Sequence, residues 1–319
     1  MSGCEPGLRV LRSGPLALLQ DEGRFGVRRL GVTQGGPADI HAWAWANRMA
    51  GNAWGAAALE VTLGGLVLQA ERDLRLAVCG ADLNATLDDA VLPLWRDVSV
   101  RRGQVVRFAQ PASGLRAYLA VAGGFQAEPV LGSVACVVRE GLGGHDGNGS
   151  PLAEDDVLMV SKSGGRRAEG QCAWRDVPPD YTAVPSLALI PGAQIAEFDG
   201  PSLYAAFHQP WRINERADRM GVRLCGPVLH CRLDRMISEG LGLGAVQVPP
   251  DGQPIALLND RQTIGGYPRL GALEPLACAR LAQCMPGSEV RLRAVSAEEA
   301  QAEYRRFFKS VTEGDLNAG

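Results

Sequence analysis

Residues 115–124, LRAYLAVAGG, indicate the fold class of this 319-residue chain. A mostly apolar run, Leu115 to Val121, ends close to two glycines, and runs bounded by turn residues are typical of β-strands. Similar runs recur at Val61 to Leu68, Leu74 to Val78, Gln104 to Phe108, Val157 to Ser161, Leu187 to Ile190, Ala245 to Val248, Ile255 to Leu258 and Glu289 to Val295. The chain has 40 glycines and 20 prolines and no regular strand-helix alternation. We therefore expect a mainly β protein built from barrels or sandwiches, not a doubly wound parallel sheet.

A few short helices interrupt this pattern. Asp39 can cap the start of a helix that runs to Met49, and Gly51 lies just past its end. A second, short helix is expected from Ser202 to His208.

The third expected helix lies near the end of the chain. Ser296 and Glu299 form a capping box, in which each residue can satisfy a free backbone N–H group of the first turn. We expect this helix to reach about Phe307 and the polar tail after Lys309 to be frayed.

The polar stretch from Ser163 to Pro185 is rich in Gly, Arg and Pro and predicts a linker between two halves. The chain length also favours two domains, at roughly 150 residues per domain. We expect an N-terminal β-barrel half over residues 1–165, a linker over 166–185, and a C-terminal β-barrel half with a C-terminal helix over 186–319.

The composition argues against nucleic acid and membrane partners. The net charge is −3 and the arginines are spread along the chain, so no basic stripe can neutralise a phosphate backbone. No stretch approaches the 18 or so apolar residues of a membrane span, and the first residues lack a signal peptide core. A cytoplasmic location is the expectation.

Standard catalytic motifs are missing. Lysine occurs only at Lys162 and Lys309, so neither a P-loop nor a biotin carrier hairpin can be built, and we expect no covalent biotin on this chain. The glycine-rich run that starts at Gly240 leads into Pro249 and Pro250, which cannot open a dinucleotide-binding helix. The sequence has no nucleophile elbow, and its four histidines lack metal-ligand spacing, so no metal site is predicted.

Three polar constellations remain, and the first lies near the N-terminus. The segments QDEGRFG at 20–26 and QGGPAD at 34–39 combine glycines with Arg24 and Asp39. Such glycines allow a backbone to approach a ligand closely, and carboxylates at turns can orient one. The alternative is that these side chains satisfy turns and helix caps, and for Asp39 capping is the favoured role.

The second constellation is the segment RADRMGVRL at 216–224, which contains Arg216, Arg219 and Arg223. If the chain is extended from Met220, Arg219 and Arg223 share a face and could grip a carboxylate or a phosphate. Ordinary surface ion pairing, for example with Asp218, explains the same residues.

The third constellation combines Glu239, Gln247 and the loop NDRQTIGGYP at 259–268. The amides of Gly265 and Gly266 could hold an anion or a carbonyl oxygen. A turn at a barrel corner would need the glycines but not the polar residues around them, so a functional loop is favoured. Those polar residues are Asp260, Gln262, Thr263 and Tyr267.

These constellations, in this order, resemble the family called allophanate hydrolase subunit 2, biotin-dependent carboxyltransferase or the C-type subunit of 5-oxoprolinase. The resemblance covers residues from about Leu11 to Ala294. It rests on QDEGRFGVRRLGVTQGGPAD, LEVTLGG, GAD, YLAVAGG, RADRMGVRL, SEG, GAVQVP and DRQTIGGYP.

The resemblance implies two cyclophilin-like β-barrel units and a site shared with other subunits. These are a B-type subunit, similar to a kinase-inhibitor protein, and an A-type hydrolase subunit. Together they would open 5-oxo-L-proline to L-glutamate with ATP, which would be shared with the partners.

On this resemblance each candidate residue receives a role. Arg219 or Arg223 would hold the substrate carboxylate or the nucleotide phosphates, and Arg24 and Asp39 would line the same cleft. The catalytic candidates are Asp260, Gln262, Thr263 and Tyr267, and the other substrate-binding candidates are Arg216, Glu239, Gln247, Gly265 and Gly266.

Two other functions stay open. The same cleft could receive carboxybiotin from a separate carrier in a biotin-dependent amide or urea carboxylase. The chain could also be a regulator that binds the kinase-inhibitor-like partner without doing chemistry.

Overall fold

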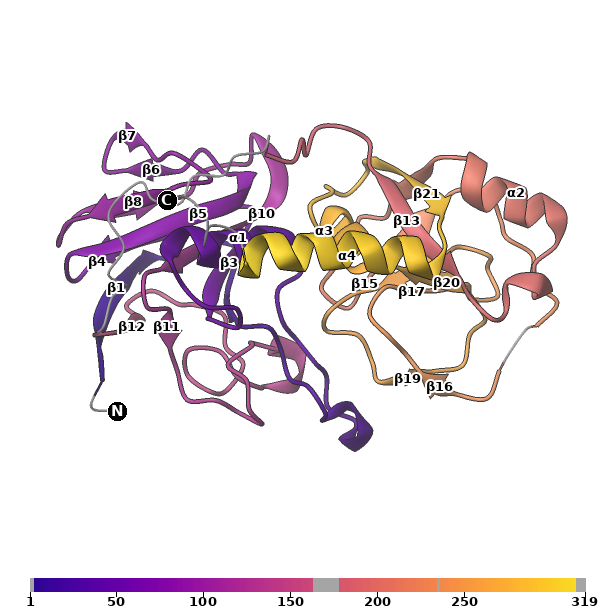
Figure 1. Ribbon diagram of the computed structural model, residues 1–319, viewed down its shortest axis with the longest axis horizontal. Helices are drawn as coiled ribbons and strands as arrows, with labels where there is room; N and C mark the ends of the chain where they lie inside the picture. Colours follow the sequence, from indigo (N-terminus) through magenta and orange to yellow (C-terminus); the bar gives the residue numbers. More distant parts are fainter. Residues whose placement is uncertain (1–2, 163–177, 234–235, 314–319) are drawn as a thin grey trace. The chain divides into compact units, whose positions relative to one another are not determined.

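The computed structural model describes residues 3–162, 178–233 and 236–313, which form two compact units (Figure 1). Unit 1 comprises Met1–Phe25, Gly35–Asp180 and Lys309–Gly319, and unit 2 comprises Gly26–Gln34 and Tyr181–Phe308. Most of the expected linker, 166–185, falls outside the described residues, so its boundaries stay predictions. The nine residues from Gly26 to Gln34 belong to unit 2 although their neighbours in sequence belong to unit 1.

Unit 1 is built from two sheets with antiparallel pairing. The larger sheet has the strand order β11 (Phe125–Gln126), β12 (Val157–Ser161), β1 (Cys4–Arg12), β4 (Val67–Ala70), β9 (Val105–Arg107), β6 (Thr86–Leu87) and β7 (Ala90–Val91). The smaller sheet has the order β2 (Leu16–Gln20), β3 (Ala58–Thr62), β10 (Ser113–Val121), β5 (Leu74–Asp82) and β8 (Asp97–Val100).

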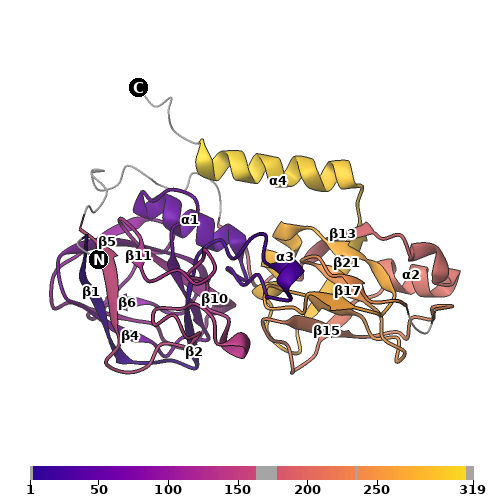
Figure 2. The same cartoon turned by 90° about the horizontal axis from the view of Figure 1, so that it is seen from below.

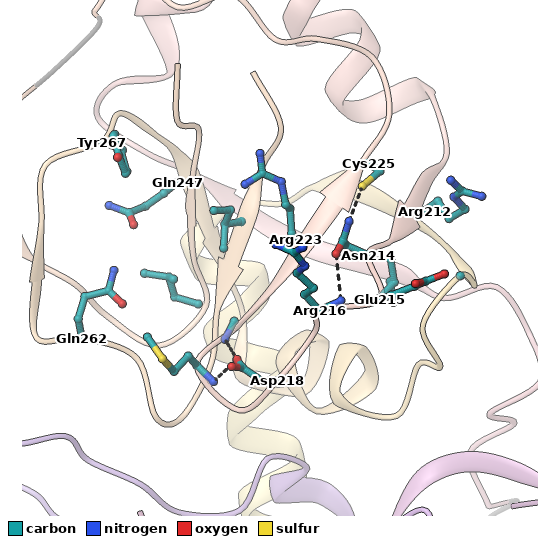
Figure 3. A pocket seen from close by; sticks show the side chains of 16 residues that line it. Arg212, Asn214, Glu215, Arg216, Asp218, Arg223, Cys225, Gln247, Gln262 and Tyr267 are labelled. Atoms are coloured by element: carbon teal, nitrogen blue, oxygen red, sulfur yellow. Dashed lines mark hydrogen bonds between the residues drawn. The ribbon is translucent and has the colours of Figure 1, made fainter. Parts of the chain in front are cut away.

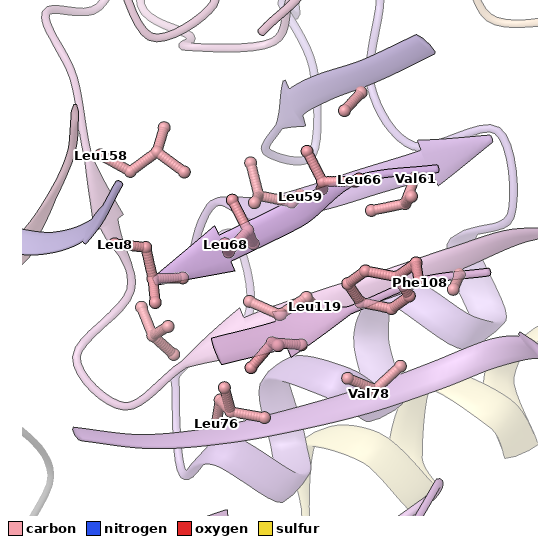
Figure 4. Packing of buried hydrophobic residues seen from close by; sticks show 14 of the residues in the cluster. Leu8, Leu59, Val61, Leu66, Leu68, Leu76, Val78, Phe108, Leu119 and Leu158 are labelled. Carbon is pink, nitrogen blue, oxygen red and sulfur yellow. The ribbon is translucent and has the colours of Figure 1, made fainter. Parts of the chain in front are cut away.

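The core of unit 1 contains a large hydrophobic cluster to which both sheets contribute (Figure 4). Leu8 and Leu68 come from the larger sheet, Val78 and Leu119 come from the smaller one, and Phe108 follows β9. All five side chains are buried. Removing this apolar surface from water is the main force that holds the sheets together.

Helix α1 (Ile40–Ala50) confirms the first predicted helix. The Asp39 side chain accepts a hydrogen bond from the Ala42 backbone N–H at 2.9 Å, and Gly51 ends the helix in the left-handed region. The helix packs on β5 and β10. Asp39 is therefore a helix cap, as its sequence context predicted.

The expected strand from Val61 to Leu68 is wrong as a single element. It is split into β3 and β4 by a turn in which Leu63, Gly64 and Gly65 have φ angles of 62°, 77° and 78°. A Cβ atom on Gly64 would lie 1.8 Å from the Ala109 carbonyl oxygen. The two adjacent glycines thus mark a tight reversal within an apolar run.

Unit 2 contains a closed barrel of seven strands (Figure 2). Its strands follow the order β13 (Ser186–Pro191), β20 (Arg269–Leu273), β17 (Ala245–Gln247), β18 (Ile255–Leu257), β15 (Gly221–Cys225), β14 (Trp211–Ile213) and β21 (Glu289–Ala294). The parallel pairing of β13 with β21 closes the barrel. The predicted mainly β fold is confirmed.

Strands β16 (Glu239–Gly240) and β19 (Ile264–Gly265) form a separate two-stranded sheet of unit 2. The short helix α2 (Gly200–His208) agrees with the second predicted helix and contacts β21. Three-residue 3-10 turns complete the two units at η1 (Arg28–Leu30), η2 (Val138–Glu140) and η3 (Ile195–Glu197).

Two helices depart from the sequence prediction. Helix α3 (Pro275–Ala282) was not expected, because its cap is a glutamate: the Glu274 side chain accepts from the N–H groups of Leu276 and Ala277. Helix α4 (Ala297–Thr312) starts at the predicted capping box, where the Ser296 hydroxyl accepts from the Glu299 N–H at 3.1 Å. It continues to Thr312, so the expectation of a frayed chain directly after Lys309 is wrong.

Candidate functional site

A pocket of about 770 Å³ opens on the outer face of the unit 2 barrel (Figure 3). Side chains alternate along a strand, so one set of residues faces the barrel interior and the other faces outward. On β15, Val222 and Leu224 belong to the buried core of the barrel, whereas Gly221, Arg223 and Cys225 line the pocket. The full lining is Arg212, Ile213, Asn214, Glu215, Arg216, Asp218, Met220, Gly221, Arg223, Cys225, Gln247, Ile255, Leu257, Gln262, Tyr267 and Gly287.

Three neighbouring strands place a cation, an apolar floor and a carboxamide in one row. Arg223 on β15 is the register partner of Ile255 on β18, and Ile255 is also the register partner of Gln247 on β17. Because neighbouring strands are about 4.8 Å apart, the backbones of Arg223 and Gln247 are roughly 10 Å apart. This spacing suits a small molecule lying across Ile255.

Gln247 is the most telling residue of the pocket. Its side chain is only 3% exposed, yet its Nε2 atom has no hydrogen-bond partner among the described residues. A buried donor without an acceptor is unfavourable by about 1 to 3 kcal/mol. A ligand that presents a carbonyl or carboxylate oxygen would remove this penalty.

The opposite side of the pocket is cationic. Arg216 and Arg223 both project there, and Figure 3 shows them between Gln247 on one side and Asn214 on the other. Arg223 forms an ion pair with Asp251, whose side chain is 49% exposed. For the Arg216 guanidinium, no hydrogen-bond or ion-pair partner exists within the described part of the chain.

The segment that carries Arg216 is shaped by two local turns. The Asn214 side chain accepts from the Arg216 backbone N–H at 2.9 Å. The Asp218 carboxylate accepts from the N–H groups of Met220 at 2.8 Å and Gly221 at 3.1 Å, and β15 begins there. Asn and Asp commonly form such turns with the backbone two residues on.

Gln262 and Tyr267 line the same pocket from the loop at 259–268. Tyr267 is 44% exposed. The structure therefore brings together Arg216 and Arg223 of the second predicted constellation with Gln247, Gln262 and Tyr267 of the third.

Arg219 and Asp260 occupy a different place from the one expected. Arg219 donates from Nε and Nη2 to the two carboxylate oxygens of Asp260, both at 2.9 Å. The two side chains are 7% and 8% exposed, and neither lines the pocket. This buried pair gives both residues a structural role. The catalytic role of Asp260 and the substrate grip of Arg219 stay predictions.

The glycine pair of the third constellation also has a structural explanation. Gly265 pairs with Glu239 in the small sheet of β16 and β19, and the Gly266 carbonyl accepts from the Met236 N–H at 2.9 Å. Glu239 is exposed and pairs with Arg269.

Thr263 acts through its backbone: its carbonyl accepts from the Leu241 N–H at 3.0 Å. Together with Glu239, Gly265 and Gly266, it stays outside the pocket lining.

Arg24 and Asp39, the candidates of the first constellation, lie in unit 1. Arg24 is 1% exposed and donates to the backbone carbonyls of Val130 at 3.0 Å and Ser133 at 3.3 Å. The Asp39 backbone N–H donates to the Tyr118 hydroxyl, which in turn donates to Glu60, both at 2.7 Å. Burial raises the pKa of the Tyr118 hydroxyl well above its usual value. These contacts support loops and cap a helix. The predicted role of Arg24 and Asp39 in substrate binding stays a prediction.

Sequence reasoning missed several members of the site. Arg212 and Glu215 line the pocket, and Asp251 pairs with Arg223. Arg212 and Glu215 flank Asn214 in the WRINER run before the predicted strand, a signal that was available. Asp251 had no such signal, because it lies in the turn between β17 and β18 and meets Arg223 of β15, which is 28 positions earlier in the sequence.

Arg28 and Arg261 also escaped the candidate set. Arg261 is 2% exposed and donates to the backbone carbonyls of Leu241 at 3.2 Å and Leu258 at 3.1 Å. Burial, assisted by the positive charge of Arg28, lowers the pKa of Arg261 to about 10.

Within residues 3–162, 178–233 and 236–313, no three side chains of His, Cys, Asp or Glu gather in a way that could hold a metal ion. No helix of these residues has both the length and the apolar character needed to cross a membrane.

Comparison with known proteins identifies the family to which the chain belongs. The family model described as "Carboxyltransferase domain, subdomain A and B" matches residues 30–294. The chain therefore belongs to this carboxyltransferase domain family, which confirms the resemblance seen in the sequence.

Particular relatives narrow the comparison. The chain is 37% identical to the C-type subunit of 5-oxoprolinase from Escherichia coli K12, over 95% of this chain and 97% of that protein. It is 30% identical to a putative urea carboxylase of Emericella nidulans, over 95% of this chain but only 26% of that protein. The crystal structure of Kluyveromyces lactis urea carboxylase superposes with a TM-score of 0.88 at 24% identity, over 98% of this chain and 30% of that one, and shows a shared fold.

Proposed function

We propose that this chain is the C-type subunit of an ATP-dependent 5-oxoprolinase and that the unit 2 pocket binds 5-oxo-L-proline. Identity of 37% over nearly the whole length of a C-type 5-oxoprolinase subunit supports the assignment. The observation that carries the pocket proposal is the buried amide of Gln247 opposite the cation of Arg216, both without a partner among the described residues.

The two ends of 5-oxoproline match the two sides of the pocket. Its carboxylate would bind the Arg216 guanidinium, with Arg223 beside it, because arginine recognises carboxylates through paired N–H donors. Its lactam carbonyl would accept a hydrogen bond from Gln247 Nε2. Ile255 and Leu257 would contact the ring methylenes between these groups.

The remaining polar residues of the pocket would orient the lactam. Gln262 offers a carboxamide and Tyr267 a hydroxyl from the same loop. Held in one geometry, the lactam would react with a smaller loss of entropy than it would when free in solution. We assign these residues to substrate positioning, and Asp260 to the support of their loop through Arg219.

Ring opening needs an energy source because a lactam is a poor electrophile. The proposed overall reaction consumes two water molecules: one in the conversion of ATP to ADP and phosphate, and one in the opening of the lactam, where a water oxygen is added to the lactam carbon. The carbon-nitrogen bond breaks, and the nitrogen takes a proton to become the amino group of L-glutamate. We propose that ATP is shared with partner subunits.

The partners in this proposal are a B-type subunit, similar to a kinase-inhibitor protein, and an A-type hydrolase subunit. Two relatives, at 37% and 36% identity, are themselves named as subunits, which supports activity in a complex. The seven cysteines that the structure describes are free thiols. Free thiols suit a reducing compartment, so the cytoplasm is the proposed location.

A second function is favoured by a specific observation. The family is named for carboxyltransferase domains, and a putative urea carboxylase is 30% identical over 95% of this chain. In that case the pocket would accept carboxybiotin and an amide or urea. The carrier would lie outside residues 1–319, because neither Lys162 nor Lys309 lies in a carrier motif.

One experiment separates these functions. The chain is purified alone and with its A-type and B-type partners, and 5-oxoproline-dependent ATP hydrolysis is followed with and without avidin. Turnover by the full set that avidin does not inhibit supports the 5-oxoprolinase. Turnover that requires a biotinylated carrier supports the carboxyltransferase, and tight pairing without any turnover supports a regulatory protein.

A further inference from the structure

The Gly26–Gln34 segment is a part of unit 2 that comes from far away in the sequence. It contains the short 3-10 turn η1 at Arg28–Leu30, which Gly31 ends in the left-handed region. Its contacts in unit 2 are made with residues more than 200 positions further along the chain. These contacts gather on the backbone beside the pocket.

Arg28 makes the first set of contacts. Its Nη2 atom donates to the carbonyl oxygens of Leu241 and, at 3.2 Å, Thr263, and it lies 3.5 Å from the carbonyl oxygen of Gln262. Leu241 follows β16 and Thr263 precedes β19. A single guanidinium thus joins both sides of the small sheet at the end next to the pocket. Burial lowers the pKa of Arg28, as expected for a cation partly removed from water.

The far end of the segment makes the second set of contacts. Gln34 accepts from Arg261 Nη2 at 3.3 Å, and the Thr33 hydroxyl lies 3.5 Å from the Arg261 carbonyl oxygen. Arg261 also donates to the Leu241 carbonyl. Two arginines therefore converge on one carbonyl group, and the segment is attached to the loop at both of its ends.

These contacts bear directly on the pocket wall. Gln262 lines the pocket, and Leu241 packs in a small cluster with Leu257 and Ile255, which form the pocket floor. The carbonyl oxygens of Leu241, Gln262 and Thr263 would repel one another if no cation stood between them. A change at Arg28 would therefore alter the position of Gln262 without removing any group that touches the ligand.

We propose that Arg28 is a positioning residue for the pocket: it holds the backbone at Leu241 and at Gln262 to Thr263 so that Gln262 faces the substrate. Only the claim that Gln262 faces the substrate rests on the proposed function. The claim that Arg28 fixes the backbone at Leu241 and at Gln262 to Thr263 does not depend on what the pocket binds.

The first test needs no substrate. Hydrogen-deuterium exchange is compared in the Arg28→Met chain and in the matched control Arg29→Met, whose exposed neighbouring side chain has no partner in the described part of the structure. The amides of Leu241 and Met236, which bond the Thr263 and Gly266 carbonyls, are expected to exchange about tenfold faster in Arg28→Met. Equal exchange in the two variants would overturn the proposal.

The second test uses the assembled complex. Arg28→Met is expected to raise the KM for 5-oxoproline about tenfold while kcat stays within about twofold, and Arg28→Lys is expected to recover part of the KM. A wild-type KM in Arg28→Met would overturn the positioning role, even with faster exchange. If Arg28→Met does not fold, Arg28→Lys is compared with Arg29→Lys in both measurements. If the wild-type complex has no turnover with 5-oxoproline, the proposed function fails and the exchange experiment alone decides the role of Arg28.

Discussion

Unit 2 contains two arginine-aspartate pairs whose arginines are only four residues apart. In the Arg219–Asp260 pair both side chains are less than a tenth exposed, and the guanidinium meets the carboxylate through two hydrogen bonds. In the Arg223–Asp251 pair the side chains are 35% and 49% exposed. The same two groups thus meet in very different environments, and access to water decides what each pair can do.

The buried pair cannot exchange its partner easily. Removing either charge would leave the other in a medium of low dielectric constant, where an unpaired charge is strongly unfavourable. The exposed pair is weak, because water and salt screen it, and contributes between about 0 and 1 kcal/mol. Arg223 can therefore leave Asp251 for a ligand carboxylate, whereas Arg219 is committed to the architecture of the loop.

Breaking the buried pair should have the largest effect. Asp260→Asn is expected to lower the free energy of unfolding by about 3 to 5 kcal/mol, because the Arg219 charge stays buried without its counterion. Chemical denaturation of the purified chain measures this loss. The double substitution Arg219→Met with Asp260→Leu should recover most of it, and a single variant as stable as wild type would contradict the structural role.

Arg216 offers the opposite case, a cation without a protein partner in the described structure. Arg216→Met should leave the free energy of unfolding within about 0.5 kcal/mol of wild type. It should raise the KM for 5-oxoproline in the complex by about tenfold or more, since a charged hydrogen bond to the substrate is lost. Arg291→Met, on the exposed side of β21, is the matched control. Equal KM values in both variants would place the substrate elsewhere.

Gln247 is buried like the Arg219–Asp260 pair, but its amide donor has no acceptor within the described residues. Its substitution tests whether this donor contributes to stability, as the buried pair does, or to ligand binding, as we propose for Arg223. Gln247→Leu removes an amide that lacks an acceptor, so stability should rise by about 1 kcal/mol while the KM for 5-oxoproline rises about fivefold. Thermal unfolding and steady-state kinetics provide the two readings. A loss of stability would mean that the amide already has a partner within the protein.

The smallest effect is expected at Asp251. Asp251→Asn frees Arg223, so the KM for 5-oxoproline should fall about twofold to threefold, and stability should change by less than about 1 kcal/mol. The change in KM should shrink at high salt, where the wild-type pair is already screened. An increase in KM would show that Asp251 assists binding instead of competing with it.

Local patterns predicted much of this molecule. Most of the expected apolar runs contain one strand each, and the caps at Asp39 and Ser296 marked two helices. Strands such as β1, β2, β14 and β20 were not among the expected runs. Arg223 was a candidate of the second constellation, and Gln247 and Tyr267 were candidates of the third, and one pocket contains all three.

The remaining features depend on distant contacts. The partner of Arg219 is 41 residues away, and the Arg28 contact to Leu241 spans 213 residues. A periodicity within a strand carries no information about such pairings. Strand β15 starts only at Gly221, which is why Arg219 does not share the outward face predicted for it with Arg223.

The placement of Gly26–Gln34 in unit 2 has a consequence for any attempt to dissect the protein. A fragment that begins after residue 177 would contain every strand of the barrel but would lack Arg28 and Gln34, which hold the backbone beside Gln262. The two units therefore cannot be separated by a single cut in the gene. A faithful C-terminal fragment would need those nine residues supplied as a peptide or grafted onto its new amino terminus.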